Sequence, residues 1–522
     1  MSNDAVQQIS KIGREKQMKL FKRLMAVMFA LTLTLGMGTR VYAKDDEGTD
    51  KPTTYTITMT STTGHTYTAY QVFAGDLDAE EGTLSNITWG TGVNETDLLN
   101  ALKSDATYGT AFTNCATAAD VAKKLATYTN SADIAALAKI IGAHKATEAG
   151  NGTTSISGLA AGYYLIVDTT AENSMPAGNT YSDFMLEVVK NVEVAAKDTT
   201  TTSEKKVKDI NDSQANSLTN WQDSADYDLG DAVPFKLKGT VASDYDKYST
   251  YYFAFHDEEC EGLTFNANSV HVYVDDVEIT EGFVVNTTSL EDDCTFEVVF
   301  ENLKNISSVN AGSVITVEYN STLNESAVMG SEGNPNTSHI EFSNNPNGDQ
   351  HGKTPDDTVI VFTYKVVVNK VDENNQPLTG AGFTLYKKND AGEYVAVGSE
   401  LKGAAMTEFT WNRLDDGDYK IVETTTPPTY NTITPIEFSI TADHEVTSES
   451  PQLTNLSGDV TSGQVTFTPR TQDGSLTTTV INQKGSTLPS TGGIGTTIFY
   501  VLGGLLVAGA GIVLVARKKA AE

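Results

Sequence analysis

Apolar and polar residues alternate along most of this chain, as they do in β-strands that bury one face and expose the other. The segments YTITMT (55–60) and HTYTAYQVF (65–73) alternate in this way near the N-terminus. Further along, GLAAGYYLIVDTT (158–170) and YSDFMLEVVKNVEVAAK (181–197) again have the composition of strands. These segments predict one strand-rich domain over residues 44–198.

A stretch with helical spacing interrupts this first domain. Apolar residues recur every three or four positions in TAADVAKKLATY (117–128) and in SADIAALAKIIGAH (131–144). Thr117 and Ser131 are suitable N-caps, and Gly142 is a suitable stop. The first domain is therefore predicted to carry a helical insertion.

A second series of strands follows the polar linker DTTTTS (198–203), and the polar break PNGDQHGKTPDD (346–357) comes after it. Turn-forming Asn, Gly and Asp residues separate the strands. About eight strands predict a sandwich or barrel over residues 199–363. The clearest strands are VPFKLKGTV (233–241), YYFAFHD (251–257), SVHVYVDD (269–276), CTFEVVF (294–300), SVITVEYN (313–320) and SHIEFSNNP (338–346).

A third domain is predicted over residues 364–485. YKVVVNKVDENNQPLTGAGFTLYKKND (364–390) has the pattern strand, turn, strand, and FTWNRLDDGDYKIVETTTPPTY (409–430) repeats it. TTTVIN (477–482) supplies a last strand. The chain is therefore predicted to be mainly β, with tandem immunoglobulin-like sandwich domains.

The N-terminus carries a targeting segment. Three basic residues precede the apolar stretch LMAVMFALTLTLGMG, and the small-residue sequence VYA follows it. This order is typical of a secretory signal peptide, so residues 1–43 are predicted to be removed by cleavage after Ala43.

The C-terminus carries one apolar segment and very little beyond it. Residues 498–516 are uncharged and just long enough to cross a bilayer. Arg517, Lys518 and Lys519 would stay on the cytoplasmic side, which places the body of the protein outside. A single span with so short a cytoplasmic tail is poorly suited to signalling, because almost nothing lies inside to receive a signal. It is better suited to holding the chain in the membrane temporarily. Residues 486–522 are therefore predicted to be a sorting region with a transmembrane helix.

Charge and cysteine content narrow the classes of function. The 522 residues carry a net charge of −32, and removal of the two basic ends makes the remainder more negative. Such a surface repels nucleic acid and anionic lipid. Three cysteines cannot form a disulfide framework, and either Cys260 pairs with Cys294 or a buried thiol is left over. We predict no metal site, no cofactor and no hydrolase site, and we expect His65 at the surface.

The pentapeptide LPSTG, formed by Leu488, Pro489, Ser490, Thr491 and Gly492, precedes the apolar segment. Pentapeptide, apolar span and basic tail in this order resemble the LPxTG sorting signal of Gram-positive surface proteins. The resemblance implies that a sortase cysteine attacks the carbonyl of Thr491, releases the chain from Gly492 onward and passes the acyl group to an amine. An amine of peptidoglycan would give an anchored monomer, and a lysine of another copy would give a covalent polymer.

Three strands of the third domain each end an apolar row with a polar side chain. Residues two apart in a strand share a face. The rows are Val366, Val368 and Lys370; Tyr419, Ile421 and Glu423; and Thr478, Val480 and Asn482. If the rows face the core, burial lowers the pKa of Lys370 and raises that of Glu423. A neutral Lys370 amine would then attack the Asn482 carboxamide and release ammonia, with Glu423 moving protons.

The same unit resembles the collagen-adhesin B-type sandwich through KVD (370–372), GAGFTLY (380–386) and GDYKIVE (417–423). The resemblance implies the same isopeptide bond between Lys370 and Asn482.

The second domain resembles the isopeptide-forming fimbrial domains through EKKVKD, FAFHDEECEGLTF and SHIEFSNNP. Shared faces favour Lys205 over Lys206 and Asn344 over Asn345, and the matching acid is Asp257. We recognise no comparable set in the first domain.

The first domain ends in VEVAAK, which resembles the pilin motif VxVYPK that carries an acceptor lysine. Ala195 and Ala196 replace the aromatic residue and the proline of that motif. The resemblance makes Lys197 the expected acceptor of Thr491 from the next copy, with Lys190 second.

The whole ectodomain resembles the major, shaft-forming pilins of Gram-positive sortase-assembled pili. The resemblance implies a secreted structural subunit, a sortase substrate and not an enzyme, in a cell-wall-anchored pilus that supports adhesion. The implied partners are pilin-specific and housekeeping sortases, other copies of the chain, peptidoglycan, minor pilins and host surface ligands. The alternative is a monomeric wall-anchored adhesin, or a basal or tip subunit, that does not use Lys197.

Overall fold

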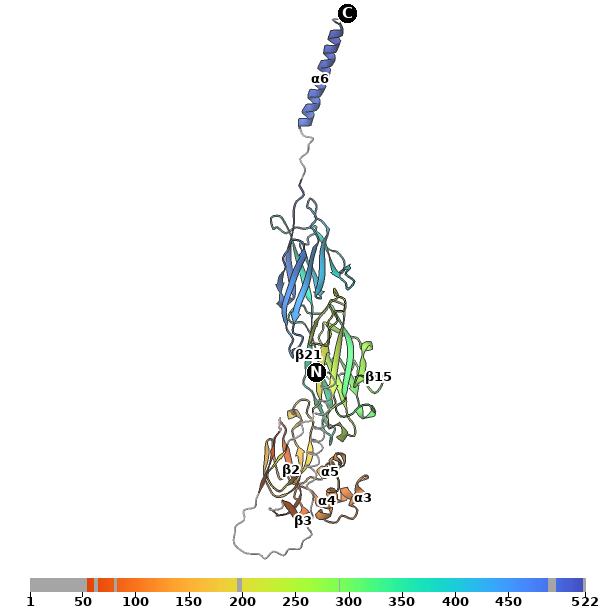
Figure 1. The fold of residues 1–522 in the computed structure, drawn as a ribbon, viewed down its shortest axis with the longest axis vertical. Helices are drawn as coiled ribbons and strands as arrows, with labels where there is room; N and C mark the ends of the chain where they lie inside the picture. Colours follow the sequence, from red (N-terminus) through yellow and green to blue (C-terminus); the bar gives the residue numbers. More distant parts are fainter. Residues whose placement is uncertain are drawn as a thin grey trace, which may run out of the picture.

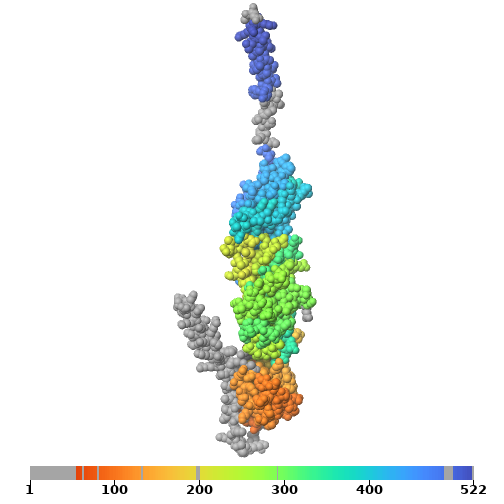
Figure 2. Space-filling model, turned by 90° about the vertical axis from the view of Figure 1, so that its right-hand side faces the viewer, coloured from red at the N-terminus to blue at the C-terminus, as the bar shows by residue number. Residues whose placement is uncertain are grey.

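The described part of the chain forms three β-sandwich domains in a row. The computed structural model describes residues 54–60, 64–78, 82–194, 200–290, 292–486 and 494–519. Figures 1 and 2 show the three domains following one another along the long axis of the molecule. Within the described residues, named strands of one domain pair with strands of that same domain. The predicted fold class, mainly β with tandem sandwiches, is confirmed. The predicted signal peptide and its cleavage site at Ala43 lie outside the described residues.

The first domain packs a central sheet between a smaller sheet and a group of helices. Its strands are β1 (Tyr55–Met59), β2 (Tyr67–Asp78), β3 (Thr83–Trp89), β4 (Gly150–Gly152), β5 (Ser155–Leu159), β6 (Gly162–Asp168), β7 (Asp183–Val188) and β8 (Val192–Val194). Its helices are α2 (Glu95–Ser104), α3 (Gly109–Phe112), α4 (Ala118–Leu125), α5 (Ser131–Ala143) and the 3-10 turn η1 (Glu172–Ser174). The sheets have the orders β3-β2-β6-β7, with β4 added to β2, and β5-β1-β8.

The central sheet of this domain is buried on both faces. Along β6, Tyr164 and Ile166 pack in the core shared with β1 and β5, whereas Leu165 and Val167 pack against the helices. A strand that is covered on both sides loses the alternation of polar and apolar residues, which explains the continuous apolar run in this part of the sequence.

The helical insertion is present, with one predicted boundary confirmed and two shifted. Thr117 caps α4 through a capping box with Asp120, as the sequence predicts. In α5, Ser131 is the first helical residue, because the N–H of Ile134 already bonds the carbonyl of Asn130 at 3.1 Å. Gly142 lies inside α5, which ends one residue later, so it is not the stop.

The second domain is a sandwich of two large sheets. Its strands are β9 (Thr202–Val207), β10 (Ser224–Asp226), β11 (Ala232–Thr240), β12 (Phe253–Glu259), β13 (Leu263–Phe265), β14 (His271–Val274), β15 (Val277–Ile279), β16 (Val284–Asn286), β17 (Phe296–Phe300), β18 (Val314–Leu323), β19 (Asn334–Ser343), β20 (His351–Lys353) and β21 (Asp357–Phe362). Its 3-10 turns are η2 (Tyr245–Lys247), η3 (Ala267–Ser269) and η4 (Leu303–Asn305). One sheet has the order β10-β21-β19-β12-β17-β16, and the other β15-β14-β18-β11-β9. The described strands outnumber the eight predicted, because several have only three residues.

The third domain repeats the sandwich with fewer strands. They are β22 (Tyr364–Asp372), β23 (Gly382–Lys388), β24 (Tyr394–Ala396), β25 (Leu401–Lys402), β26 (Glu408–Leu414), β27 (Gly417–Thr425), β28 (Ile436–His444), β29 (Leu453–Ser462), β30 (Thr468–Arg470) and β31 (Ser475–Asn482), with the 3-10 turn η5 (Thr471–Asp473). The sheets have the orders β26-β22-β31-β30 and β24-β23-β27-β28-β29. Apolar residues from both inner faces form one core.

One helix follows the third domain. This helix, α6 (Ile494–Lys519), is apolar over its length and ends in Arg517, Lys518 and Lys519. From Ile498 to Lys519 it is long and apolar enough to cross a membrane.

Candidate functional site

The third domain brings Lys370, Glu423 and Asn482 together inside its sandwich. β22 and β31 are parallel neighbours, and their register sets Lys370 opposite Val480 and Asp372 opposite Asn482. Lys370 and Asn482 therefore project from adjacent strands of one sheet, and Glu423 projects from β27 of the facing sheet. The three residues are 1%, 4% and 0% exposed. We call them the third-domain cluster.

Hydrogen bonds in the third-domain cluster hold the amide against the acid. Asn482 Nδ2 donates to Glu423 Oε1 at 2.8 Å, and Glu423 Oε2 accepts from the N–H of Ile433 at 3.0 Å. Lys370 Nζ donates to two backbone carbonyls, at 2.9 and 3.2 Å, one of them on β31. Asn482 Oδ1 has no hydrogen-bond partner among the described residues. The carboxamide is therefore fixed by its nitrogen, and its carbonyl oxygen is left free to accept a proton.

Burial changes the protonation of the amine. Loss of hydration lowers the pKa of Lys370 to about 8, against opposing effects of Glu423 and Asp372. A substantial fraction of this amine is therefore neutral at pH 8, and the neutral amine is the nucleophilic form.

The second domain contains a cluster of the same kind. Lys205 Nζ donates to Asp257 Oδ2 at 2.5 Å and to the Tyr319 hydroxyl at 3.0 Å. That hydroxyl donates to Asp257 Oδ2 at 2.8 Å and accepts from Asn336 Nδ2 at 3.0 Å. The four residues are at most 2% exposed. They come from β9, β12, β18 and β19, and we call them the second-domain cluster.

Electrostatics favour a neutral amine and a neutral acid in the second-domain cluster. Burial lowers the pKa of Lys205 and raises the pKa of Asp257, while the attraction between the two groups opposes both shifts. Asn336 Oδ1, like Asn482 Oδ1, has no hydrogen-bond partner among the described residues.

The predicted asparagine of this cluster is wrong. The ladder between β12 and β19 pairs Glu259 with Asn336 and Phe253 with Phe342, so Asn344 lies beyond the opposite end of β12 from Asp257. Eight residues of extended strand separate the two asparagines by about 26 Å. Asn344 instead accepts a backbone hydrogen bond from Tyr181 of the first domain at 2.7 Å.

The sequence pattern favours Lys205 over Lys206, and the structure places Lys205 on the inward face of β9. Lys205 points into the core, whereas Lys206 is partly exposed and bonds Asp223 on the outside. Asn345, the other alternative, bonds the Gln350 side chain at 3.0 Å and is no nearer to Asp257 than Asn344.

The first domain has no comparable set in its described part, where every lysine is at least partly exposed. Lys190 is one of these exposed lysines, and Lys197 lies outside the described residues. The expected exposure of His65 is wrong, because the residue is 2% exposed and bonds Asp168 at 2.6 Å and Asn179 at 3.1 Å.

The cysteines are free thiols in this structure, so the alternative of a Cys260–Cys294 disulfide is contradicted. Cys294 Sγ lies 3.6 Å from His256 Nδ1, and Cys260 Sγ lies 4.0 Å from Asn334 Oδ1. Different neighbours on different strands hold the two thiols.

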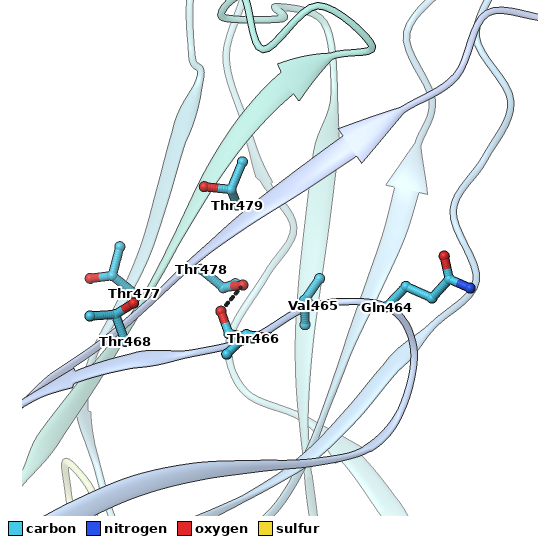
Figure 3. A pocket seen from close by; sticks show the side chains of 7 residues that line it. All are labelled: Gln464, Val465, Thr466, Thr468, Thr477, Thr478 and Thr479. Carbon is cyan, nitrogen blue, oxygen red and sulfur yellow. Dashed lines mark hydrogen bonds between the residues drawn. The ribbon is translucent and has the colours of Figure 1, made fainter.

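A surface groove of the third domain lies beside β30 and β31 and is separate from both clusters (Figure 3). Its lining consists of Gln464, Val465, Thr466, Thr468, Thr477, Thr478 and Thr479. The Thr478 hydroxyl donates to the Thr466 carbonyl at 2.9 Å, as Figure 3 shows. These side chains offer hydroxyls and one amide but no titratable group, so the groove does not provide acid–base chemistry.

Two known family models match this chain, one in the third domain and one at the C-terminus. The SpaA family, described as a prealbumin-like fold domain, matches residues 364–452. The LPXTG cell wall anchor motif matches residues 481–522, which include the predicted LPSTG and α6. Leu488 to Gly492 lie outside the described residues.

A curated relative extends the match into the ectodomain. The trypsin-resistant surface T6 protein of Streptococcus pyogenes serotype M6 is 28% identical over 336 residues, which are 51% of this chain and 60% of that protein. This chain is similar to the T6 protein over the matched segment. The match spans less than two thirds of the relative's length. With its anchor motif and α6, this chain is a cell-wall-anchored surface protein of a Gram-positive bacterium.

One solved structure supports the fold of this chain. The T6 backbone pilin of serotype M6 S. pyogenes, described as a modular three-domain structure, superposes with a TM-score of 0.51 and 19% identity, covering 83% of this chain and 98% of that one. The major pilin SpaD of Corynebacterium diphtheriae gives a TM-score of 0.47 at 17% identity, covering 84% and 99%. At this identity, the first likeness concerns the fold alone.

Proposed function

We propose that this chain is the shaft subunit of a covalent, sortase-assembled surface pilus. The row of three sandwiches between a secretion segment and a wall anchor supports a structural role, as does the homology to a protein whose solved form is a backbone pilin. The observation that carries the proposal is the pair of buried lysine, acid and asparagine clusters, one in each of two successive domains.

Sortase is proposed to join successive copies. Its cysteine attacks the Thr491 carbonyl, the Thr491–Gly492 bond breaks, and the new amine of Gly492 leaves with the anchor. The ε-amine of Lys197 in another copy then attacks the acyl-enzyme and releases the cysteine. Lys197 follows β8 by three residues, at the end of the first domain, where it would meet the C-terminus of the preceding copy.

Within each copy, the third-domain cluster is proposed to form an isopeptide bond. The neutral Lys370 amine attacks Cγ of Asn482, a Lys–Asn amide forms, and the bond from Cγ to Nδ2 breaks to release ammonia. Glu423 takes the proton that the Lys370 nitrogen loses on attack and delivers it to Nδ2, which leaves as ammonia. Its 2.8 Å contact with Nδ2 is suitable for this delivery.

The second-domain cluster is proposed to form the equivalent bond between Lys205 and Asn336. Asp257 receives the proton of the Lys205 amine across their 2.5 Å contact. The Tyr319 hydroxyl bonds the amine, the acid and the amide, so it holds the three groups in reach of one another.

Both bonds would strengthen a fibre under tension. Lys370 and Asn482 lie on the first and last strands of their domain, so their bond closes a loop of about 113 residues. By analogy with disulfides, closing a loop of this length stabilises by about 4–5 kcal/mol. A pull on the two ends loads the covalent bond before the hydrogen bonds of the loop.

Intact mass of the ectodomain tests the chemistry. Each bond releases one ammonia, so the expected deficit against composition is about 17 Da per bond, for two bonds. Glu423→Ala is expected to remove one of the two deficits, because the amine then lacks its proton carrier. Glu423→Gln and the partly exposed Glu437→Gln provide a matched pair, in which only Glu423→Gln is expected to lose a deficit. A full deficit in Glu423→Ala would take Glu423 out of the mechanism.

The lowered pKa of Lys370 gives a prediction for pH. In Asn482→Ala no bond forms, and Lys370 stays buried with a folded-state pKa of about 8, below the unfolded value of about 10.4. Between these values the unfolded chain binds more protons, so the stability of this variant is expected to rise with pH, by up to about 3 kcal/mol. Below pH 8, the contribution of Lys370 to the free energy of unfolding does not change with pH.

Denaturant unfolding from pH 7 to pH 10 measures this slope. The double variant Lys370→Met, Asn482→Ala lacks the amine and reports the titration of all other groups. Equal slopes in the two proteins would mean that burial does not lower the pKa of Lys370.

A monomeric wall-anchored adhesin is the second candidate, because the anchor motif fits it equally well. Denaturing gels of cell-wall extracts distinguish the two, since only the pilus subunit gives a ladder of covalent multimers.

A further inference from the structure

A group of carboxylates and one imidazole lies where the second and third domains meet. Asp209 follows β9 and Asp226 ends β10, in the second domain, whereas Asp415 and Asp416 form the turn after β26 and His444 ends β28, in the third. Donor atoms of Asp209, Asp226 and His444 lie within 4.8 Å of one another, and so do those of Asp226, Asp415 and Asp416. Asp226 is common to both sets and links the two domains.

The centre of this group is buried and incompletely bonded. Asp226 is 2% exposed and Asp415 is 0% exposed. Asp226 Oδ2 makes no hydrogen bond of normal length to a described residue, and the buried Tyr364 hydroxyl makes only a weaker contact with this carboxylate. A buried carboxylate oxygen without a donor is costly, because nothing replaces its lost hydration.

The orientation of His444 shows which of its ring nitrogens faces the carboxylates. The Ser224 hydroxyl lies 2.7 Å from the carbonyl of Glu445 and 2.7 Å from His444 Nδ1. A carbonyl only accepts, so the hydroxyl donates to it and accepts the Nδ1 proton. In the neutral ring, Nε2 then presents a lone pair.

That lone pair faces two carboxylate oxygens. His444 Nε2 lies 3.7 Å from Asp226 Oδ1 and 3.9 Å from Asp209 Oδ2. Both distances exceed those of hydrogen bonds. They match the spacing of neighbouring donors around a metal ion, since ligand bonds of about 2.0–2.2 Å separate such donors by about 3–4 Å. With no ion bound, the pKa of His444 is raised: burial lowers it, but Asp226, Asp209 and Asp416 outweigh burial, and the protonated ring is then their counter-charge.

Lys387, the lysine near this group, does not neutralise the carboxylates of Asp209 and Asp226. Lys387 Nζ is bound by Asp212, Asp228 and Asp415, at 3.1, 2.6 and 3.2 Å. Lys387 is therefore paired with the adjoining group of Asp212, Asp228 and Asp415. Among the described residues, Asp209, Asp226 and Asp416 have no lysine of their own, and His444 is the basic group beside them.

We propose that Asp209, Asp226, Asp416 and His444 bind one divalent transition-metal ion, which clamps the second domain to the third. Carboxylate oxygens suit Mn²⁺, and an added imidazole nitrogen suits Zn²⁺ and Mn²⁺ better than Ca²⁺ or Mg²⁺. The ion ties the two domains together noncovalently at the joint, independently of the isopeptide bonds proposed above.

Equilibrium dialysis of the metal-stripped ectodomain against Mn²⁺ or Zn²⁺ tests this site. We expect one ion per chain, bound at least tenfold more tightly than Ca²⁺, and a rise in melting temperature when either ion is added. Asp226→Asn is expected to weaken binding at least tenfold, and Asp416→Asn serves as a second variant if Asp226→Asn does not fold. Asp390→Asn, which removes the same charge from an exposed loop of the third domain, is expected to bind as the parent does.

His444→Gln separates the imidazole from the carboxylates. It is expected to bind more weakly and to lose the preference for Mn²⁺ and Zn²⁺ over Ca²⁺. Binding that is unchanged in Asp226→Asn and Asp416→Asn, or a preference that survives His444→Gln, would overturn the proposal, as would the absence of any bound ion.

Discussion

Replacing Asn336 with Ala is expected to halve the mass deficit of the ectodomain, from two ammonia molecules to one, or by about 17 Da. The remaining amine and acid, Lys205 and Asp257, then have no carboxamide in reach. The second domain also loses a closed loop of about 130 residues, worth about 4–5 kcal/mol. Its unfolding transition is expected to fall by roughly 10–20 °C in calorimetry.

Asn344→Ala is the matched control, because it removes the same kind of buried side chain from the residue that directly follows β19. Its mass deficit is expected to stay complete, since the register of β12 and β19 holds Asn344 far from Asp257. The opposite result, a deficit lost with Asn344 and kept with Asn336, would mean that Lys205 reacts at the other end of the strand.

Asn336 and Asn344 show that the faces of a strand, read from the sequence alone, do not identify the asparagine of the second-domain cluster. Residues 336, 338, 340 and 342 of β19 are buried, and so is residue 344 directly after the strand, so the rule of alternate residues cannot choose between the asparagines. The choice depends on the pairing of β19 with β12, which is a property of the folded sheet. The sequence also hides Asn336, because Asn-Pro-Asn directly after Gly-Ser-Glu-Gly is typical of a turn, whereas here it begins a ten-residue strand.

The third-domain cluster was predictable in full because each of its three strands carries a long alternating row. Rows that end in Lys370, Glu423 and Asn482 leave one orientation that buries the apolar residues, and this orientation brings the polar ends together. The carboxylates and His444 where the second and third domains meet have no comparable pattern in the sequence. These donors come from two domains and from turns and strand ends, where polar residues are common, so only the folded structure shows that they converge.

Replacing Lys197 with Arg is expected to abolish covalent multimers on cells that express the pilus sortase. Arg keeps the positive charge, but its guanidinium stays protonated and cannot attack the acyl-enzyme at Thr491. Denaturing gels of wall extracts are expected to show the monomer alone, and its mass deficit is expected to stay complete, because the two internal clusters do not involve Lys197. The loss of polymer would therefore not reflect misfolding.

Lys190→Arg provides the control for this experiment. Lys190 is exposed in the turn between β7 and β8, seven residues before Lys197, and carries the same charge. Its variant is expected to form ladders like those of the parent chain. Ladders that persist in Lys197→Arg and vanish in Lys190→Arg would move the acceptor to Lys190. If the parent chain gives monomers alone in the presence of an active pilus sortase, the chain is a wall-anchored adhesin, and the shaft assignment is wrong.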